Sequence, residues 1–214
     1  MSRKIISWLV VPLLVILLAG GILVAAALRS SQVPTRPGGG PTSAHSPLIG
    51  LLIPKTDRKF GYGMLVPARW QAVDLGDRRA YVPPDSQHKS DRLVLTATNY
   101  RVLADRNKNL RVMQLELFRQ HPDPVGWTKA IEMSWRDTGM RFQKESGLAN
   151  GVIYSVRPAE DQMQLVAFLV DAGQPMNLTM EGYGTYSSRE TLVREGLLED
   201  FQTMAQSLHA VDTK

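Results

Sequence analysis

The chain has 214 residues and no cysteine, which excludes disulfides, thiol catalysis and cysteine-ligated metals. Its formal charge is +5, but four of its 25 basic residues and none of its acidic ones lie before residue 48: Arg3, Lys4, Arg29 and Arg36. The other 21 basic residues face 20 acidic ones, which leaves a net charge of +1. This balance removes the compositional support for nucleic-acid binding, so we expect no nucleic-acid partner.

An uncharged apolar segment follows a short tail at residues 1–4. Residues Ile5–Leu28 contain no charged side chain, and a helix of this length measures roughly 36 Å, enough to cross a hydrocarbon core of about 30 Å. We therefore predict a single transmembrane anchor that contacts the lipid bilayer through residues 5–28. A cleaved signal peptide is the alternative, because Arg3 and Lys4 precede the segment and Ala25–Ala27 offers small residues to a peptidase.

The orientation of this anchor follows from what comes after it. Basic residues flank the segment on both sides, so the charge bias is nearly balanced. A large domain that follows a signal-like segment is normally translocated, and we therefore predict a single-pass protein of the cytoplasmic membrane with an extracytoplasmic C-terminal domain. In a third reading, Gly20-Gly21 and Ala25–Ala27 let the anchor itself pack against a partner helix.

A Pro/Gly-rich linker, residues 29–47, separates the anchor from the domain at residues 48–214. Its part Ser30–Pro47 holds four prolines and three consecutive glycines, so it cannot bury a core and is predicted to be a mobile tether. Its mean reach is on the order of 25 Å. The short apolar run Leu48–Ile53 that follows is expected to pack on the domain, with an interfacial position as the alternative.

The first half of the domain has the composition of strands. β-branched and aromatic residues, separated by turn residues such as Pro67-Ala68, predict an antiparallel meander. We expect strands at Phe60–Val66, Arg69–Leu75, Arg79–Val82, Arg92–Tyr100 and, from its alternating pattern, Leu110–Arg119.

The second half alternates helix, hairpins and helix. After Pro124, the four-residue spacing of Trp127, Ile131 and Trp135 predicts a helix that ends at Gly139. The continuously apolar Leu165–Val170 is expected to be the central strand. The strands of this half are predicted at Met140–Glu145, Gly151–Arg157, Met163–Asp171 and Met176–Tyr183.

A closing helix is predicted from its start signal and its periodicity. Ser187 and Glu190 have the spacing of a capping box. One apolar face, widened by Leu198 and Ala205, is traced by Val193, Leu197, Phe201, Met204 and Leu208. Together these elements predict an α+β fold in which helices sandwich an antiparallel sheet, preceded by a single transmembrane helix.

Short signatures of this layout resemble the PsbP-like superfamily over roughly Phe60–Leu208. They are an aromatic-glycine strand with a Pro-x-x-Trp turn, a Gly-led hairpin pair, and a closing helix that ends F-x-x-M-x-x-S-L. The matching residues are Gly63, Pro67, Trp70, Gly151, Phe201, Met204, Ser207 and Leu208.

This resemblance implies a PsbP-like antiparallel sandwich that acts as a binding or assembly module and not as an enzyme. The family includes extrinsic photosystem subunits and anchored or secreted bacterial proteins of unknown role. The chain departs from the photosynthetic members in its N-terminal anchor, and no stretch matches their ion or photosystem contacts. That role is therefore not carried over.

Motifs with known chemistry do not occur in the chain: there is no G-x-S-x-G, P-loop, H-E-x-x-H or EF-hand spacing. We predict no catalytic, cofactor-binding or metal-binding residues and no cofactor. Glu160-Asp161 is interpreted as a solvated hairpin tip, and Glu181, near Tyr183, as an edge position facing water. Four scattered histidines are predicted to be solvated: His45, His88, His209 and, beside Asp123, His121.

Three further features have a structural and a functional interpretation. The helical spacing of Trp127 and Trp135 favours core packing over stacking on a sugar or base. Asn177 begins a formal glycosylation sequon that we attribute to chance. A solvated face and anionic headgroup contact both remain open for the basic cluster of Lys55, Arg58, Lys59, Arg69, Arg78 and Arg79.

The function predicted from these features is a membrane-tethered, non-catalytic binding or assembly module at the outer side of the cytoplasmic membrane. Its expected partner is another envelope or membrane protein. The alternative is a small-ligand carrier or enzyme with a cleft between helix and sheet.

Overall fold

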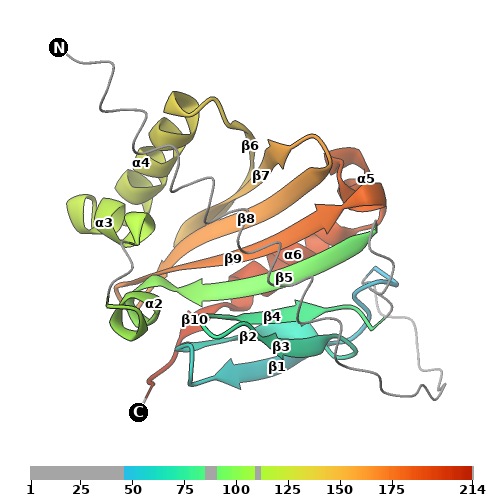
Figure 1. Ribbon diagram of the computed structural model, residues 1–214, viewed down its shortest axis with the longest axis horizontal. Helices are drawn as coiled ribbons and strands as arrows, with labels where there is room; N and C mark the ends of the chain where they lie inside the picture. Colours follow the sequence, from blue (N-terminus) through green and yellow to red (C-terminus); the bar gives the residue numbers. More distant parts are fainter. Residues whose placement is uncertain (1–45, 85–90, 109–111, 214) are drawn as a thin grey trace. The chain divides into compact units, whose positions relative to one another are not determined.

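The computed structural model of the chain describes residues 46–84, 91–108 and 112–213 (Figure 1). These described residues group into one compact unit. The predicted anchor at residues 5–28 and the tether up to residue 45 lie outside the described residues, so both stay predictions. Within the described ranges, no helix has the length and apolar character needed to span a membrane.

Two antiparallel sheets form the framework of the domain. The larger has seven strands, in the spatial order β3 (Gln71–Asp74), β4 (Arg79–Val82), β5 (Arg92–Asn99), β9 (Gln174–Tyr183), β8 (Gln162–Asp171), β7 (Gly151–Ala159) and β6 (Arg141–Leu148). The smaller places β2 (Tyr62–Pro67) between β1 (Leu52–Asp57) and the short β10 (His209–Ala210).

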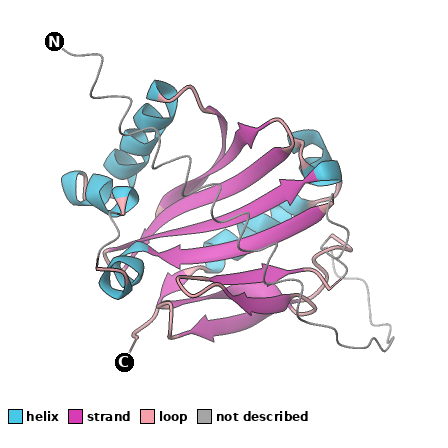
Figure 2. Cartoon of the chain, viewed as in Figure 1, coloured by secondary structure: helices cyan, strands magenta, loops and turns pink. Residues whose placement is uncertain are grey.

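Helices lie on both sides of the seven-stranded sheet (Figure 2). One side, here called the helix face, packs against α4 (Pro124–Asp137), with α2 (Tyr100–Arg106) and α3 (Met113–Gln120) beside it. The other side, the inner face, packs against α6 (Leu197–Ser207) and the small sheet. The turn η1 (Gly184–Tyr186) and helix α5 (Arg189–Arg194) connect β9 to α6.

Each face of the sheet supports its own hydrophobic core. On the helix face, Trp127 is fully buried and meets the rings of Tyr100, Phe118 and Phe168 edge-on, with centroids 5.5–6.1 Å apart. The inner core is larger, and its fully buried side chains include Tyr62, Leu95, Leu165, Leu178, Phe201 and Met204. The helix-and-sheet sandwich predicted from the sequence is confirmed.

Most strand predictions are confirmed, but the first strands do not form one meander. The turn after β2 does exist, because Trp70 N donates to Pro67 O over 3.1 Å. It sends the chain from the small sheet into the seven-stranded sheet, where β3, β4 and β5 then form a meander. Local pattern shows where strands end, and it does not show which strand pairs with which.

The prediction of a strand at Leu110–Arg119 is wrong, because Met113–Gln120 forms helix α3. Leu115 and Phe118 are both buried, and a spacing of three residues places them on the same helical face toward Trp127. The helix propensity of leucine, methionine and glutamate therefore decided the element. Helix α2 was not predicted; it begins where the side chain of Asn99 accepts from the amides of Arg101 and Val102.

The closing helix is two helices, which corrects the prediction of one. Gly196 adopts a left-handed φ of 72° between α5 and α6, a conformation that breaks helical geometry. The N-cap of α5 is Ser188 and not the predicted Ser187. The Ser188 hydroxyl accepts from Thr191 N. Because Val193 precedes the break, it is 46% exposed and does not share the buried face of α6.

The central strand is β9, whereas the prediction was Leu165–Val170 in β8. The sequence indicated burial on both faces of β8, and the structure confirms it for residues 163–169. Strand β8 is one place from the centre. The middle place belongs to a strand whose two faces differ in polarity, and this strand carries the candidate site.

Candidate functional site

Polar residues line the helix face of the central strand. Along β9, Asn177, Thr179 and Glu181 alternate with the buried Leu178 and Met180. Successive side chains of a strand point to opposite faces, so the three polar residues share the helix face. Their neighbours on β5 and β8 extend this surface, the polar tract, which comprises Arg92, Thr96, Gln162, Gln164, Asn177, Thr179, Glu181 and Tyr183.

Sheet register brings the members of the polar tract together from distant parts of the sequence. Tyr183 of β9 pairs with Arg92 of β5 on one side and with Gln162 of β8 on the other. Two residues along the strand, Glu181 pairs with Gln164 of β8. Paired residues of adjacent antiparallel strands have Cβ atoms about 4.5–5.5 Å apart, which places these side chains within reach of one another.

A hydrogen-bonded network centres on the carboxylate of Glu181. The Tyr183 hydroxyl donates to Glu181 Oε2 over 2.7 Å and accepts from Gln162 Nε2 over 2.9 Å. Gln164 Nε2 donates weakly to Glu181 Oε1 over 3.4 Å. The guanidinium carbon of Arg92 lies 4.2 Å from the centre of the Tyr183 ring, a cation–π contact.

Burial sets the electrostatics of this network. Loss of water raises the pKa of Glu181, and this effect outweighs the hydrogen bond from Tyr183 and the positive charges of Arg78 and Arg92. Burial likewise raises the pKa of Tyr183, with the neighbouring Glu181 charge adding to it. Glu181 therefore holds a proton more readily than an ordinary carboxyl, while Tyr183 remains a neutral phenol.

Two buried atoms of the tract find no hydrogen-bond partner among the described residues. They are Arg92 Nε, a donor, and Asn177 Oδ1, an acceptor. The other end of the Asn177 amide donates to Thr179 Oγ1 over 3.0 Å. Unpaired buried polar groups cost stability. Arg92 and Asn177 are six register positions apart, about 20 Å along the strands, so the two atoms belong to opposite ends of the tract.

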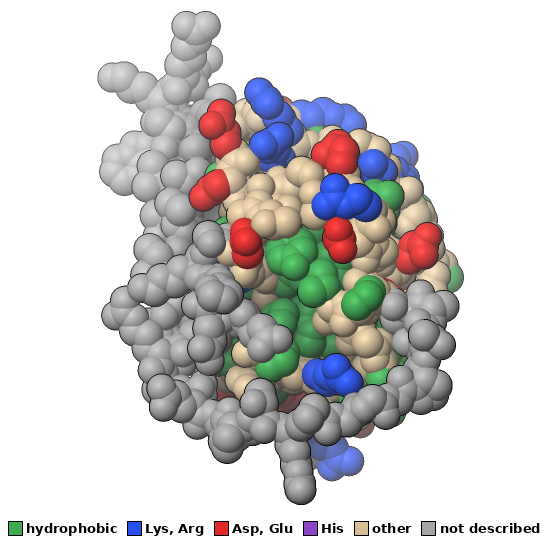
Figure 3. All heavy atoms as spheres, turned by 90° about the vertical axis from the view of Figure 1, so that its right-hand side faces the viewer, with side chains coloured by type: hydrophobic (Ala, Val, Ile, Leu, Met, Phe, Trp, Pro, Cys, Tyr) green, Lys and Arg blue, Asp and Glu red, His purple; other side chains and the backbone are tan. Residues whose placement is uncertain are grey.

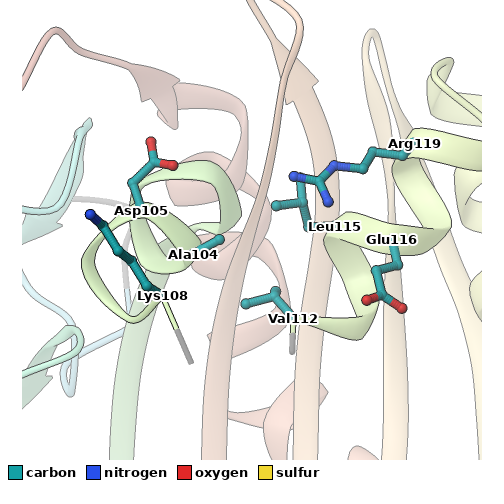
Figure 4. Close-up of a pocket in the computed structure, with 7 residues that line it drawn as sticks. All are labelled: Ala104, Asp105, Lys108, Val112, Leu115, Glu116 and Arg119. Carbon is teal, nitrogen blue, oxygen red and sulfur yellow. The ribbon is translucent and has the colours of Figure 1, made fainter. Parts of the chain in front are cut away.

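A hollow of about 550 Å³ lies between α2 and α3 (Figure 4). Asp105 and Lys108 come from the α2 side, and Glu116 and Arg119 from α3. The apolar part of the lining is Ala104, Val112 and Leu115. Charges of both signs occur here, so the hollow selects neither anions nor cations.

The two histidines within the described residues do not form a site. His121 lies at the C-terminal end of α3, and its neighbour Asp123 caps α4 by accepting from Gly126 N over 2.8 Å. His209 lies in β10 against Gly63. No group of three or more metal-ligating side chains occurs in the described part of the chain. His45 and His88 lie outside it.

Several other interpretations from the sequence are confirmed. Trp127 is a core residue, and Trp135 packs its ring against Phe142, Tyr154 and Phe168. The carboxylates of Glu160-Asp161 are exposed at the turn of the β7–β8 hairpin. For the basic cluster both interpretations stay open; ion pairs divide it, because Lys59 pairs with Asp74, Arg78 with Asp77 and Arg79 with Asp57.

The interpretation of Glu181 as a water-facing edge residue is wrong. It lies on the middle strand of the large sheet, and its side chain is part of the polar tract. The sequence did contain a signal, since Asn177, Thr179, Glu181 and Tyr183 occupy every second position. That alternation also fits an edge strand with one wet face, and only the sheet order separates the two cases.

Among known proteins, a solved structure shows partial similarity to this chain. No family model matches the chain, and no curated protein matches it. A similar solved structure is the solution structure of cyanobacterial PsbP (CyanoP) from Synechocystis sp. PCC 6803, with 12% identity and a TM-score of 0.39. The match covers 81% of this chain and 98% of that one. It assigns no ligand, partner or residue role to this chain.

Proposed function

We propose that this chain is a membrane-tethered, non-catalytic binding module at the outer side of the cytoplasmic membrane, with another envelope or membrane protein as its partner. Residues 5–28 act as the anchor, residues 29–47 as the tether, and the α+β domain as the binding element. The observation that carries the proposal is the way in which the domain holds the end of its tether.

Ser46, at the end of the tether, is fixed to the domain. Its amide donates to the buried carboxylate of Asp200 in α6 over 2.9 Å, and its carbonyl accepts from Ile49 N and Gly50 N. Ile49 follows as a core residue that is 1% exposed. A polar, Pro-rich chain therefore ends at a rigid point on the domain, as expected for a module whose distance from the anchor is set by tether length.

Chemistry within the polar tract also favours binding over catalysis. The Tyr183 hydroxyl donates to Glu181, so the two groups satisfy each other. A general base acts by taking a proton from a substrate group within hydrogen-bond reach. A carboxyl that already accepts from a phenol in a buried network is better suited to hold a ligand than to transfer protons.

Topology and partner capture together test this proposal. In intact cells, an externally added protease should cleave within the Pro/Gly-rich tether and release the domain. Photo-crosslinkers placed on the domain of the full chain should then capture a membrane protein. A domain that is protected from protease outside the cell, or a chain that does not float with lipid, would contradict the proposal.

The polar tract favours a second candidate function, a carrier of a small polar ligand. The unpaired Asn177 Oδ1, an acceptor that a ligand's donor would satisfy, is the specific observation. A metabolite library should then contain a compound that raises the melting temperature of the wild-type chain and not that of Asn177→Leu. If crosslinking captures a protein partner and no compound gives a shift, the carrier function is rejected.

A further inference from the structure

An apolar patch surrounds the point where the tether joins the domain. Within the described residues, four large hydrophobic side chains are exposed, and two of them, Leu51 at 64% and Val193 at 46%, lie on segments that contact or adjoin Ser46. The other two, Val125 and Met133, belong to α4. Apolar side chains that gather on one surface mark a contact site, whereas single exposed ones are ordinary. The segments that carry Leu51 and Val193 meet at Ser46, which is why the two are considered together.

Backbone contacts hold the segments of this patch together. Leu51 O accepts from Ala68 N over 2.8 Å, and Leu48 O accepts from Trp70 Nε1 over 3.0 Å. These bonds join the first segment of the domain to the turn between β2 and β3. On the other side, Gly196 lies against the Cβ of Ser46 and donates its amide to Val193 O over 3.0 Å.

Exposed charged side chains of both signs lie next to the patch, because Glu190 is exposed three residues before Val193 in α5. Arg69 is exposed directly after Ala68, and no acidic side chain pairs with it in the described part of the chain. Arg194, beside Val193, is paired with Glu195. Figure 3 faces the side of the domain that carries α5 and shows hydrophobic side chains gathered near its centre, with charged ones around them.

We propose that this tether-side patch, defined as Leu51, Arg69 and Val193, rests on the bilayer surface, with the two apolar side chains at the headgroup level and Arg69 on anionic lipid. This inference depends on the proposed function, because it needs the anchor. In the sequence, 17 residues lie between Ser46 and Leu28, where the predicted membrane segment ends. A tether of this length has a mean reach of roughly 25 Å, so the face around Ser46 lies within reach of lipid.

The patch is too small to hold a free protein on a membrane, and the anchor removes that requirement. Once residues 5–28 are inserted, the tether keeps the patch close to the bilayer, so the patch meets lipid at a high effective concentration. Two apolar side chains and one arginine are then sufficient to orient the domain. The patch decides which face of the domain points to the membrane and which faces remain available to a partner.

Site-directed nitroxides in the full chain test this orientation. Because the chain has no cysteine, Leu51→Cys and Val193→Cys each give a single labelling site. Met133→Cys is the matched control, because Met133 is exposed to nearly the same degree, 62%, but lies on α4. The probe is a nanodisc that contains phosphatidylcholine and phosphatidylglycerol. We expect the ratio of oxygen to nickel-chelate accessibility to be several-fold higher at positions 51 and 193 than at position 133.

Equal ratios at the three positions would overturn the proposal. So would labels at 51 and 193 that become shielded in native membranes and not in protein-free lipid, because a membrane protein would then be the occupant. In the Leu51→Cys background, Arg69→Glu should lower the ratio at position 51 in anionic discs and leave it unchanged in phosphatidylcholine alone. Flotation of the labelled chain with lipid is checked first. A chain that fails to float contradicts the anchor, whereas a floating chain with a water-exposed label contradicts only this inference.

Discussion

The two faces of β9 differ in chemistry although they belong to the same ten residues. On the inner face, Met176, Leu178 and Met180 are fully buried in the larger core. On the helix face, Asn177, Thr179 and Glu181 belong to the polar tract, in which two buried atoms are unpaired among the described residues. Apolar burial contributes stability in proportion to area, whereas a buried polar group at best recovers what it lost from water. Stability therefore resides mainly on the inner face, and the helix face is where this strand departs from an optimal core.

The largest loss of stability is expected for Leu178→Ala. This side chain is completely buried on the inner face, and its truncation removes apolar contacts and leaves a cavity. We expect a loss of about 2–5 kcal/mol in the free energy of unfolding, measured by urea titration of the reconstituted chain. A loss below about 0.5 kcal/mol, the range of surface substitutions, would contradict the assignment of stability to the inner face.

The second effect concerns Glu145 of β6, whose side chain is 5% exposed. It accepts from Arg189 Nε and Nη2 over 2.6 and 2.7 Å and from the Ser155 hydroxyl over 2.6 Å, which ties α5 to the sheet. Replacing Glu145 with glutamine should cost about 1–3 kcal/mol at neutral pH.

The pH dependence of this effect follows from the Arg189 hydrogen bond, which lowers the pKa of Glu145 below its ordinary value of 4.5. The stabilisation is complete above that value and is lost as the pH falls through the lower folded pKa. Urea midpoints of wild type and Glu145→Gln should converge in acid. A difference between them that is independent of pH would exclude the ion pair as its cause.

Glu181 is expected to show the opposite pH dependence with a smaller amplitude. Burial raises its pKa, so the folded chain prefers the protonated form. Its contribution is complete below the ordinary value of 4.5 and declines as the pH rises through the folded pKa. Glu181→Gln keeps an acceptor for Tyr183 and removes the charge, so at neutral pH it should raise stability by about 1 kcal/mol or less. A variant that loses stability at neutral pH would show that the ionised carboxylate supports the fold.

The smallest effect is expected for Thr96→Val on the helix face of β5. Thr96 pairs with Thr179, is partly exposed, and makes no side-chain hydrogen bond within the described part of the chain. Valine has nearly the same shape and the same preference for strands. The change in unfolding free energy should stay within about 0.5 kcal/mol. A loss of 2 kcal/mol or more, the scale of core truncations, would remove the distinction between the two faces.

The α2–α3 region and the closing helices show where local sequence signals were insufficient. At Leu110–Arg119 both a period of two and a helical spacing fit the apolar residues, and the contact of Phe118 with Trp127 selected the helix. At Gly196, a residue that a helix tolerates at a cost of about 1 kcal/mol ended one helix and began another. There, Ser46 lies against Gly196, and its amide donates to Asp200 in the first turn of α6.

The sequence by itself determined the α+β class, most strands, helix α4 and the burial of Trp127, because these depend on periodicity and turn residues within short windows. It also defined the anchor and tether, which remain predictions that depend on composition alone. Only the tertiary structure decided that the early strands divide between two sheets and that β9 lies at the centre. The same applies to the joining of Arg92, Gln162 and Glu181 in one network. The physical reason is that strand pairing depends on contacts between residues far apart in sequence, and no short window contains them.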